Sequence, residues 1–107
     1  MSLVRIIATK VARSTQTNPT YFAQYVNKLS STACYMPGFI GAKSYWKVGD
    51  HMTIISISDW TSNDAWKQWV DSEKRKTICL EYDSKTLSTD NFDVLIKREK
   101  TNNIFLL

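Results

Sequence analysis

The stretch that decides the fold is Thr53–Val70, TIISISDWTSNDAWKQWV. Its first half predicts a strand, because β-branched isoleucines are interleaved with serines. Its second half predicts a helix, because Ser62 can cap the backbone amides that follow it. Three tryptophans, Trp60, Trp66 and Trp69, lie at or just beyond this strand-to-helix junction. We expect their indoles either to pack as a core or to wall a flat pocket.

The N-terminal part of the chain predicts a strand followed by a long helix. Val4–Arg13 has apolar residues on both faces, which favours a central strand that is covered on both sides. Asn18-Pro19 is a typical helix start, and Pro37-Gly38 is a typical stop. Between them, apolar residues at helical spacing predict one stripe on about five turns. The stripe consists of Phe22, Val26, Leu29, Ala33 and Met36.

A hairpin is predicted between this helix and the junction. Phe39–Val48 reads as a second strand and Met52–Trp60 as a third, with Gly49–His51 as the turn. His51, the only histidine, is therefore expected to face solvent and to be inert. The second strand is expected to present one apolar face, made of Ile40, Ala42, Trp46 and Val48.

Beyond the junction, a second helical region and a fourth strand are predicted. Ser72 is expected to cap a second helical segment, or to mark a kink in one helix, and the helical region is expected to reach about Thr86. Ser88–Asn91 is predicted to be a turn, and Phe92–Arg98 a strand that alternates around its apolar residues.

The resulting order, β-α-β-β-α-β, predicts one ferredoxin-like α+β domain over residues 1–107, with a four-stranded antiparallel sheet and a core at about 4–98. Two helices cover one face of such a sheet, yet the first and third strands are apolar on both sides. A second copy of the same sheet is the simplest cover, so we expect a homodimer. The 99–107 tail ends in the apolar run Ile104–Leu107, which we expect to dock on this subunit or its partner.

Composition and charge exclude several classes of protein. The net charge of +4 is modest, and its short basic runs are typical of a solvated surface. No apolar run is long enough to span a membrane. The first and third strands lack the stacking aromatics of RNA-recognition modules, so we expect no nucleic acid. Cys34 and Cys79 fit no zinc or C-x-x-C spacing and follow no secretory leader, which favours the cytoplasm.

Two segments of the chain carry a family resemblance. They are MPGFIG at Met36–Gly41 and SDWTSNDAW at Ser58–Trp66, in this order and separated by a hairpin. Together they resemble the antibiotic biosynthesis monooxygenase (ABM) domain, and the likeness extends over about residues 4–98. The resemblance implies a dimeric α+β barrel, in which each subunit has a pocket between its helices and its sheet.

The resemblance also implies a set of candidate site residues. Members that oxidise anthrones or quinols without metal or flavin have an asparagine four residues before the junction tryptophan and an aromatic residue six after it. Here Trp60 and Trp66 match the tryptophan and the aromatic residue, whereas Ser56 stands at the asparagine position. The family's helical arginine corresponds roughly to Leu80, and Arg75 is the nearest substitute.

The haem-degrading branch of the family fits less well. Its helical histidine position, ten residues after a tryptophan equivalent to Trp69, is occupied by Cys79. The position of its first-strand asparagine falls near Ala8. We therefore expect no haem, no metal and no other cofactor. Without a histidine to activate it, Cys79 is interpreted as an inert thiol.

A cofactor-free oxygenase stabilises a substrate carbanion or enolate in a dry aromatic slot. Trp60, Trp66 and Trp69 can supply the slot, and indole N–H groups and the Ser56 hydroxyl can bond a phenolate oxygen. Tyr82 can share a proton only if its pKa is perturbed. Since Asp59 and His51 are expected to point elsewhere, no general base is assigned.

Two functional hypotheses follow from these residues. The first is a cofactor-independent monooxygenase, an oxidoreductase that acts on a small aromatic substrate of phenolic, anthrone or quinol type. The alternative is a non-catalytic, dimeric small-molecule binding or accessory protein of the same fold. It is supported by the missing asparagine, arginine and histidine.

Overall fold

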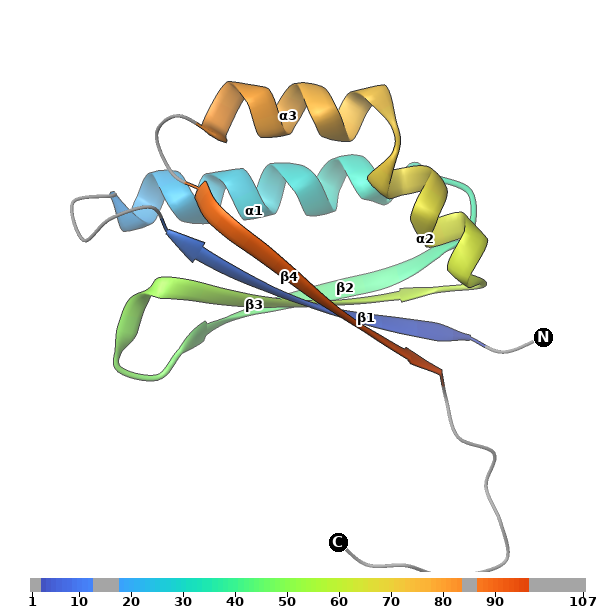
Figure 1. The fold of residues 1–107 in the computed structure, drawn as a ribbon, viewed down its shortest axis with the longest axis horizontal. Coiled ribbons are helices and arrows are strands. Elements are labelled where there is room, and N and C mark those ends of the chain that lie inside the picture. The colour runs from blue at the N-terminus through green and yellow to red at the C-terminus, as the bar shows by residue number, and fades with distance from the viewer. Residues whose placement is uncertain (1–2, 13–17, 84–86, 97–107) are drawn as a thin grey trace, which may run out of the picture.

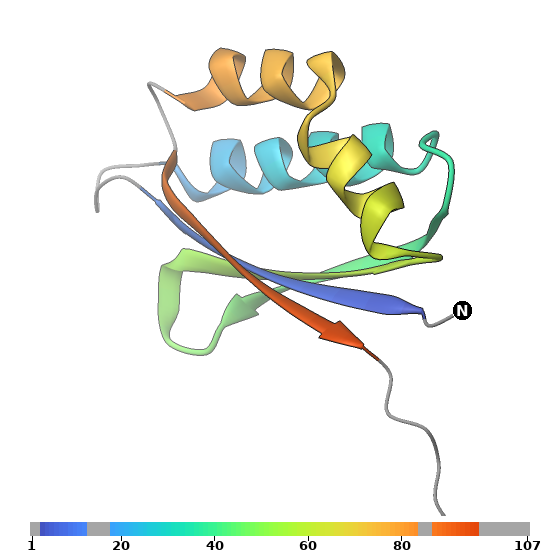
Figure 2. The same ribbon diagram turned by 45° about the vertical axis from the view of Figure 1, so that its right-hand side comes forward.

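The computed structural model describes residues 3–12, 18–83 and 87–96, and it forms one antiparallel sheet with helices on one face (Figures 1 and 2). The elements, in chain order, are β1 (Val4–Ala12), α1 (Pro19–Ala33), β2 (Phe39–Lys47), β3 (Asp50–Trp60), α2 (Asn63–Val70), α3 (Glu73–Asp83) and β4 (Leu87–Ile96).

The strand order β2-β3-β1-β4 confirms the predicted ferredoxin-like α+β fold. β1 is central, as expected, and pairs antiparallel with both β3 and β4. The second helical region is divided into α2 and α3 at Ser72, whose hydroxyl accepts a hydrogen bond from the amide of Arg75 at 3.2 Å. The predicted strand ends at Arg13 and at Lys97–Arg98 lie outside the described residues, as does the 99–107 tail.

Helix α1 is shorter than the apolar stripe predicts. The Asn18 side chain caps its start by accepting from the Thr20 amide at 2.8 Å. At the other end, the amides of Tyr35 and Met36 bond to carbonyls only three residues back, so the chain leaves the helix in tighter turns ahead of Pro37. Met36 is therefore not helical, although it still packs against the core.

The hairpin turn begins one residue earlier and ends two residues earlier than predicted. The strands are joined at Val48 and Gly49, and β3 already starts at Asp50. The reason is the Asp50 carboxylate, which accepts from the Met52 amide and from the Thr53 hydroxyl, both at 2.8 Å. Val48 is 99% exposed and belongs to no apolar face.

The expected single apolar face of β2 was also wrong, because a bulge interrupts the pairing. Phe39 pairs with Trp60 while Gly41 pairs with Asp59, so Ile40 is an extra residue. Ile40 consequently lines a groove on the sheet face opposite the helices. Ala42 lines the cavity on the helix-covered face, and Trp46 packs there against Phe22.

The predicted turn at Ser88–Asn91 is part of β4. These residues continue the pairing with β1, with Asp90 opposite Lys10 and Asn91 opposite Thr9. The turn-forming residue types were overridden by the neighbouring central strand, which supplies partners for Thr89, Asp90 and Asn91, while Ser88 falls at a shift in the register.

The core lies between the sheet and α1. Its largest fully buried side chains are Trp60, Tyr25, Phe22, Ile6 and Val26. Burying a large apolar side chain of this kind stabilises a fold by about 1.5–3 kcal/mol. The same alternation that sends Ile6 toward the helices sends Arg5 and Ile7 to the opposite face of β1.

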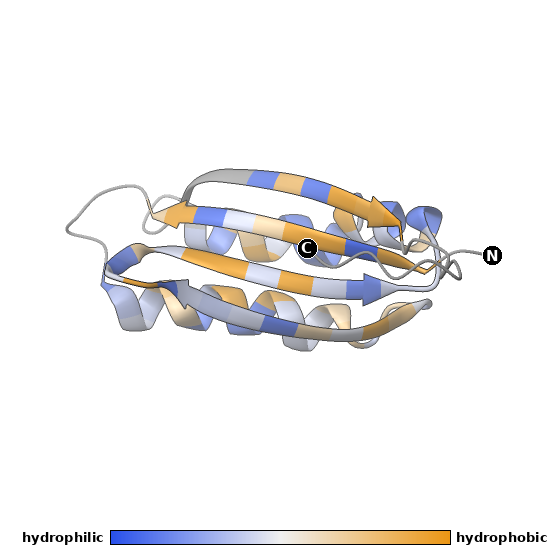
Figure 3. Ribbon diagram, turned by 90° about the horizontal axis from the view of Figure 1, so that it is seen from below, coloured by the Kyte–Doolittle hydropathy of each residue, from blue (hydrophilic) through white to orange (hydrophobic). Residues whose placement is uncertain are grey.

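Among the described residues, no helix covers the face of the sheet opposite α1, α2 and α3 (Figure 3). We call it the open face. Near the start of β1 and the end of β3, the Arg5 guanidinium makes two hydrogen bonds to the Asp59 carboxylate, at 2.8 and 3.0 Å. A groove of about 420 Å³ lies beside this ion pair. Several apolar side chains of the groove are exposed, namely Leu3, Ile40, Leu95 and Ile96.

None of the helices in the described part of the chain is long and apolar enough to cross a membrane.

Candidate functional site

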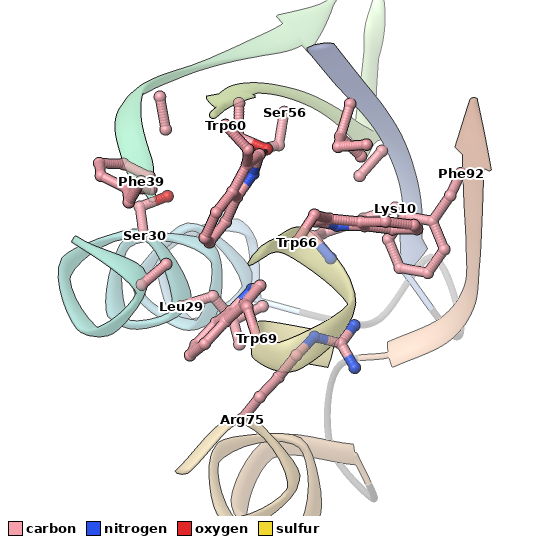
Figure 4. Close-up of a pocket in the computed structure, with 15 residues that line it drawn as sticks. Lys10, Leu29, Ser30, Phe39, Ser56, Trp60, Trp66, Trp69, Arg75 and Phe92 are labelled. Carbon is pink, nitrogen blue, oxygen red and sulfur yellow. Dashed lines mark hydrogen bonds between the residues drawn. The ribbon is translucent and has the colours of Figure 1, made fainter. Parts of the chain in front are cut away.

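A cavity of about 50 Å³ lies between the helices and the covered face of the sheet (Figure 4). All four strands and all three helices contribute to its wall. The sheet supplies Ile6, Ala8, Lys10, Phe39, Ala42, Ser56, Ser58, Trp60 and Phe92, and the helices supply Leu29, Ser30, Ala33, Trp66, Trp69 and Arg75. Five of the six expected site residues thus meet at one place, and Tyr82 is the exception.

Trp60 forms the rigid floor of the cavity. It ends β3, is 1% exposed and meets the Phe39 ring edge-on at 5.3 Å between centroids. Its indole N–H donates to the Ser58 hydroxyl at 2.9 Å. This donor is therefore already used within the protein, and Trp60 is a packing surface rather than the hydrogen-bond donor we expected. The Ser58 hydroxyl accepts this bond, and its own proton can still be donated to another group.

Trp66 and Trp69 enter the cavity from α2. The Ser62 hydroxyl caps this helix by accepting from the Ala65 amide at 3.1 Å. Trp69 is 7% exposed, whereas Trp66 is only half-buried and meets Phe92 edge-on at 5.5 Å. In the described part of the chain neither indole N–H has a hydrogen-bond partner, so both can donate to a ligand.

Ser56 also lines the cavity, as the family resemblance led us to expect. It precedes Trp60 by four residues and shares its face of β3, because side chains alternate along a strand. Among the described residues its hydroxyl has no protein partner. Like the Ser58 hydroxyl, it can donate to a ligand oxygen or accept from one.

Arg75 and Tyr82 both belong to α3, but they lie in different surroundings. Arg75 is in the first turn, and its guanidinium carbon lies 5.7 Å from the centre of the Phe92 ring, at the rim of the cavity (Figure 4). Tyr82 is in the last turn and packs against the rings of Tyr21 and Tyr25, at 4.9 and 5.2 Å between centroids. Tyr82 therefore belongs to a tyrosine cluster beside the cavity and does not line it.

Lys10, like Ser58 and Phe92, lines the cavity but was not among the expected site residues. It is 4% exposed, and its Nζ lies 5.9 Å from the ring centres of both Tyr25 and Phe92. Strand alternation carried the signal, since Lys10 continues the helix-facing series of Val4, Ile6 and Ala8. A lysine in such a series is expected to sit between sheet and helix.

The remaining titratable candidates lie away from the cavity. His51 is exposed and rests against Trp46, and Asp59 pairs with Arg5 on the open face. The Cys79 sulfur lies 3.5 Å from the Tyr25 hydroxyl and is half-buried. No three His, Cys, Asp or Glu side chains in residues 3–12, 18–83 and 87–96 gather where they could hold a metal ion.

The cavity is smaller than the expected aromatic slot. A volume of about 50 Å³ holds a few water molecules, since one water needs roughly 10–15 Å³ on a similar scale. A ring therefore enters only if part of the wall moves. Phe92, at 37% exposure, and the half-buried Trp66 and Arg75 form the movable side, whereas Trp60 and Trp69 are fixed by burial.

Comparisons of structure place this fold among known proteins. SnoaB, a cofactor-independent oxygenase from Streptomyces nogalater, is 14% identical and superposes with a TM-score of 0.79 over 96% of this chain and 100% of its own. A protein from Pseudomonas aeruginosa, also 14% identical, gives 0.78 over 92% and 97%. A conserved protein from Methanosarcina mazei, 16% identical, gives 0.69 over 92% and 95%. These superpositions, at sequence identities of 14–16%, show that the proteins share a fold.

Comparisons of sequence are more selective. No curated protein sequence is significantly similar to the chain. Residues 6–79, however, match the sequence profile of the family described as antibiotic biosynthesis monooxygenase. This match extends from the middle of β1 into α3 and includes the junction and most of the cavity wall. The chain therefore belongs to the antibiotic biosynthesis monooxygenase family.

Proposed function

We propose that this protein is a cofactor-independent monooxygenase that oxidises a small aromatic molecule of phenolic, anthrone or quinol type. The observation that carries the proposal is the cavity whose floor is Trp60 and whose movable side is Trp66 with Phe92. Family membership and the fold shared with SnoaB, a cofactor-independent oxygenase, support it.

The proposed reaction needs little from the protein beyond binding and charge stabilisation. An anthrone loses a proton from its central CH₂ group, and the resulting carbanion transfers electrons to dioxygen. Addition of oxygen at that carbon and loss of water leave a carbonyl, so the ring becomes a quinone and one oxygen atom ends in water. Trp60 and Trp66 would hold the ring, and hydroxyls of Ser56 and Ser58 would bond the anionic oxygen.

The alternative is a binding or accessory protein without chemistry. Two observations favour it. The cavity is small at about 50 Å³. Among the side chains that the structure describes, no carboxylate or imidazole lines the cavity to act as a general base.

We also propose that two copies associate through their open faces. Support comes from the exposed apolar side chains there, including Ile40 and Leu95, which are 50% and 44% exposed. β4 ends at Ile96, which also lines the groove of this face. The free thiols Cys34 and Cys79 support a reducing, cytoplasmic location.

An oxygen electrode tests the enzymatic proposal. Purified protein is mixed with a panel of anthrones and quinols, and oxygen uptake is compared for wild type, Trp66→Ala and Trp46→Ala. Trp46 is the matched control, because it packs against Phe22 outside the cavity. We expect uptake in the wild type and in Trp46→Ala and its loss in Trp66→Ala. Saturable binding of the same compounds without uptake would establish the accessory protein instead.

A further inference from the structure

One row of side chains crosses the open face from edge to edge, and its two ends carry opposite charges. From β2 to β4, the residues in register are Lys43, Ile57, Ile7 and Asp93. Directly paired residues of antiparallel strands point to the same face of a sheet. Lys43 and Ile57 line a groove together with the Arg5–Asp59 ion pair, so the row lies on the open face. Figure 3 looks onto this face, with β2 and β4 as its edges.

The next row along the strands carries its charges at the centre. In the same order, it consists of Gly41, Asp59, Arg5 and Leu95. Its acidic residue is on β3 and its basic residue is on β1, and the two form the ion pair described above. Both rows are therefore charged with opposite signs on the two sides of a line that runs between β3 and β1.

Lys43 and Asp93 lie too far apart to serve each other within one chain. Three strand spacings separate them, about 14 Å, whereas salt at physiological concentration screens exposed charges beyond about 8 Å. Both residues are exposed, and among the described residues neither has an ion-pair partner. Each can therefore pair with a charge on another molecule.

The symmetry of a dimer decides which charges meet. Two copies that pack through the same face are related by a two-fold axis between their sheets. An axis parallel to the strands, between β3 and β1, brings Lys43 against Asp93 of the partner subunit, and Asp59 against Arg5 of the partner subunit. An axis perpendicular to the strands instead brings each end of the charged row against the same end of the partner's row, so that like charges meet.

We infer that the two copies pack with aligned strands, β2 of each over β4 of the other, and that Lys43 binds Asp93 of the partner subunit. This orientation rests on the association through open faces proposed above, and it specifies how the faces meet. Facing sheets lie about 10 Å apart, a gap that a lysine and an aspartate side chain bridge together. Aligned sheets cross at about 30°, which keeps the ends of the rows near each other.

Charge reversal tests the orientation. We expect Lys43→Glu and Asp93→Lys each to weaken the dimer at least about tenfold, because by symmetry each variant creates two like-charge contacts. The double variant K43E/D93K restores opposite charges across the interface, so we expect it to associate as the wild type does. Lys67→Glu is the matched control, because Lys67 is exposed on α2, on the other side of the sheet. Sedimentation at physiological salt measures the Kd of each dimer.

Mixing the two single variants gives a second readout, which a folding defect cannot imitate. Lys43→Glu carries an affinity tag, and the untagged Asp93→Lys chain that is purified with it is quantified. The mixed dimer has opposite charges at both ends of the row, as the wild type does. Random pairing gives one half mixed dimers, whereas a tenfold loss in each homodimer predicts about nine-tenths.

The wild type alone decides the association, and the variants decide the orientation. A wild type that stays monomeric would refute the association and the orientation together. A dimeric wild type whose Kd is unchanged by either single reversal, or a double variant as weak as the single ones, would overturn the orientation only. Oxygen uptake is measured separately and decides the enzymatic proposal.

Discussion

Gly38 lies in the turn between α1 and β2 and packs closely against Thr61 and Ala65, at the start of α2. Its replacement by alanine tests how closely this turn packs against α2. Its φ is +85°, a region that costs an L-residue about 1–2 kcal/mol. An added Cβ would also lie 2.6 Å from both the Ala65 Cβ and the Thr61 Oγ1. The Gly38 carbonyl accepts from the Thr61 amide at 2.8 Å, so the turn cannot move away without losing this bond.

Overpacking of this kind costs typically about 1–3 kcal/mol, so we expect Gly38→Ala to lower the free energy of unfolding by roughly 2–5 kcal/mol in total. Urea unfolding followed by tryptophan fluorescence measures it. In thermal melts each kcal/mol corresponds to a shift of about 4–8 °C for a domain near this size.

Two other glycines separate the backbone cost from the packing cost. Gly49 has a φ of +74° but nothing within 4 Å of an added Cβ, so Gly49→Ala should lose only about 1–2 kcal/mol. Gly41 has neither feature, and Gly41→Ala should stay within about 0.5 kcal/mol of wild type. If Gly38→Ala and Gly49→Ala lower the free energy of unfolding by the same amount, the close packing of the Gly38 turn against α2 is refuted.

Three further predictions concern capping, pH and assembly. Ser62→Ala removes the hydroxyl that accepts from the Ala65 amide, and it should cost about 1 kcal/mol in urea unfolding; a loss below about 0.3 kcal/mol would mean that the cap does not stabilise α2. The Arg5 hydrogen bond holds the pKa of Asp59 below its ordinary value, so the pair stabilises the fold above the unfolded-state pKa of the carboxyl group and is lost as pH falls through the folded-state value. Thermal melts from pH 7 to pH 3 should therefore show a smaller fall in Tm for Asp59→Asn than for wild type, and parallel falls would show that this pair does not contribute. Sedimentation at micromolar concentration should show two chains travelling together, with Leu95→Lys shifting them toward one because it places a charge on the open face; a compact single chain for the wild type would contradict the paired sheets.

Strand alternation and helix capping were sufficient to predict the fold. Asn18 and Ser62 start their helices as expected, and Ser72 separates α2 from α3. The predictions were wrong where pairing with a neighbouring strand decided the structure against the preference of the local sequence. The turn-forming residues at Ser88–Asn91 became strand because β1 supplies partners, and Ile40 changed face because of one bulge.

The candidate site was predictable only in part. Ser56, Trp60, Trp66, Trp69 and Arg75 gather at the cavity because the junction and α3 pack on the same strands. Two features of the site, a hydrogen bond and the volume of the cavity, depend on tertiary structure and could not be predicted from the sequence. The indole N–H of Trp60 is engaged by Ser58, and the empty space is only about 50 Å³. Lys10 could have been found from its place in the alternation of β1, had a charged residue been weighed as part of the helix-facing series.

The most direct measurement is the crystal structure of the protein with a bound phenol, because the molecule offers two different hollows. We predict that the ring lies between Trp60 and a displaced Trp66, with its oxygen toward the hydroxyls of Ser56 and Ser58, although the cavity there is now about 50 Å³. Electron density for the ring in the groove of about 420 Å³ beside Arg5 and Asp59, with the cavity unchanged, would contradict the account.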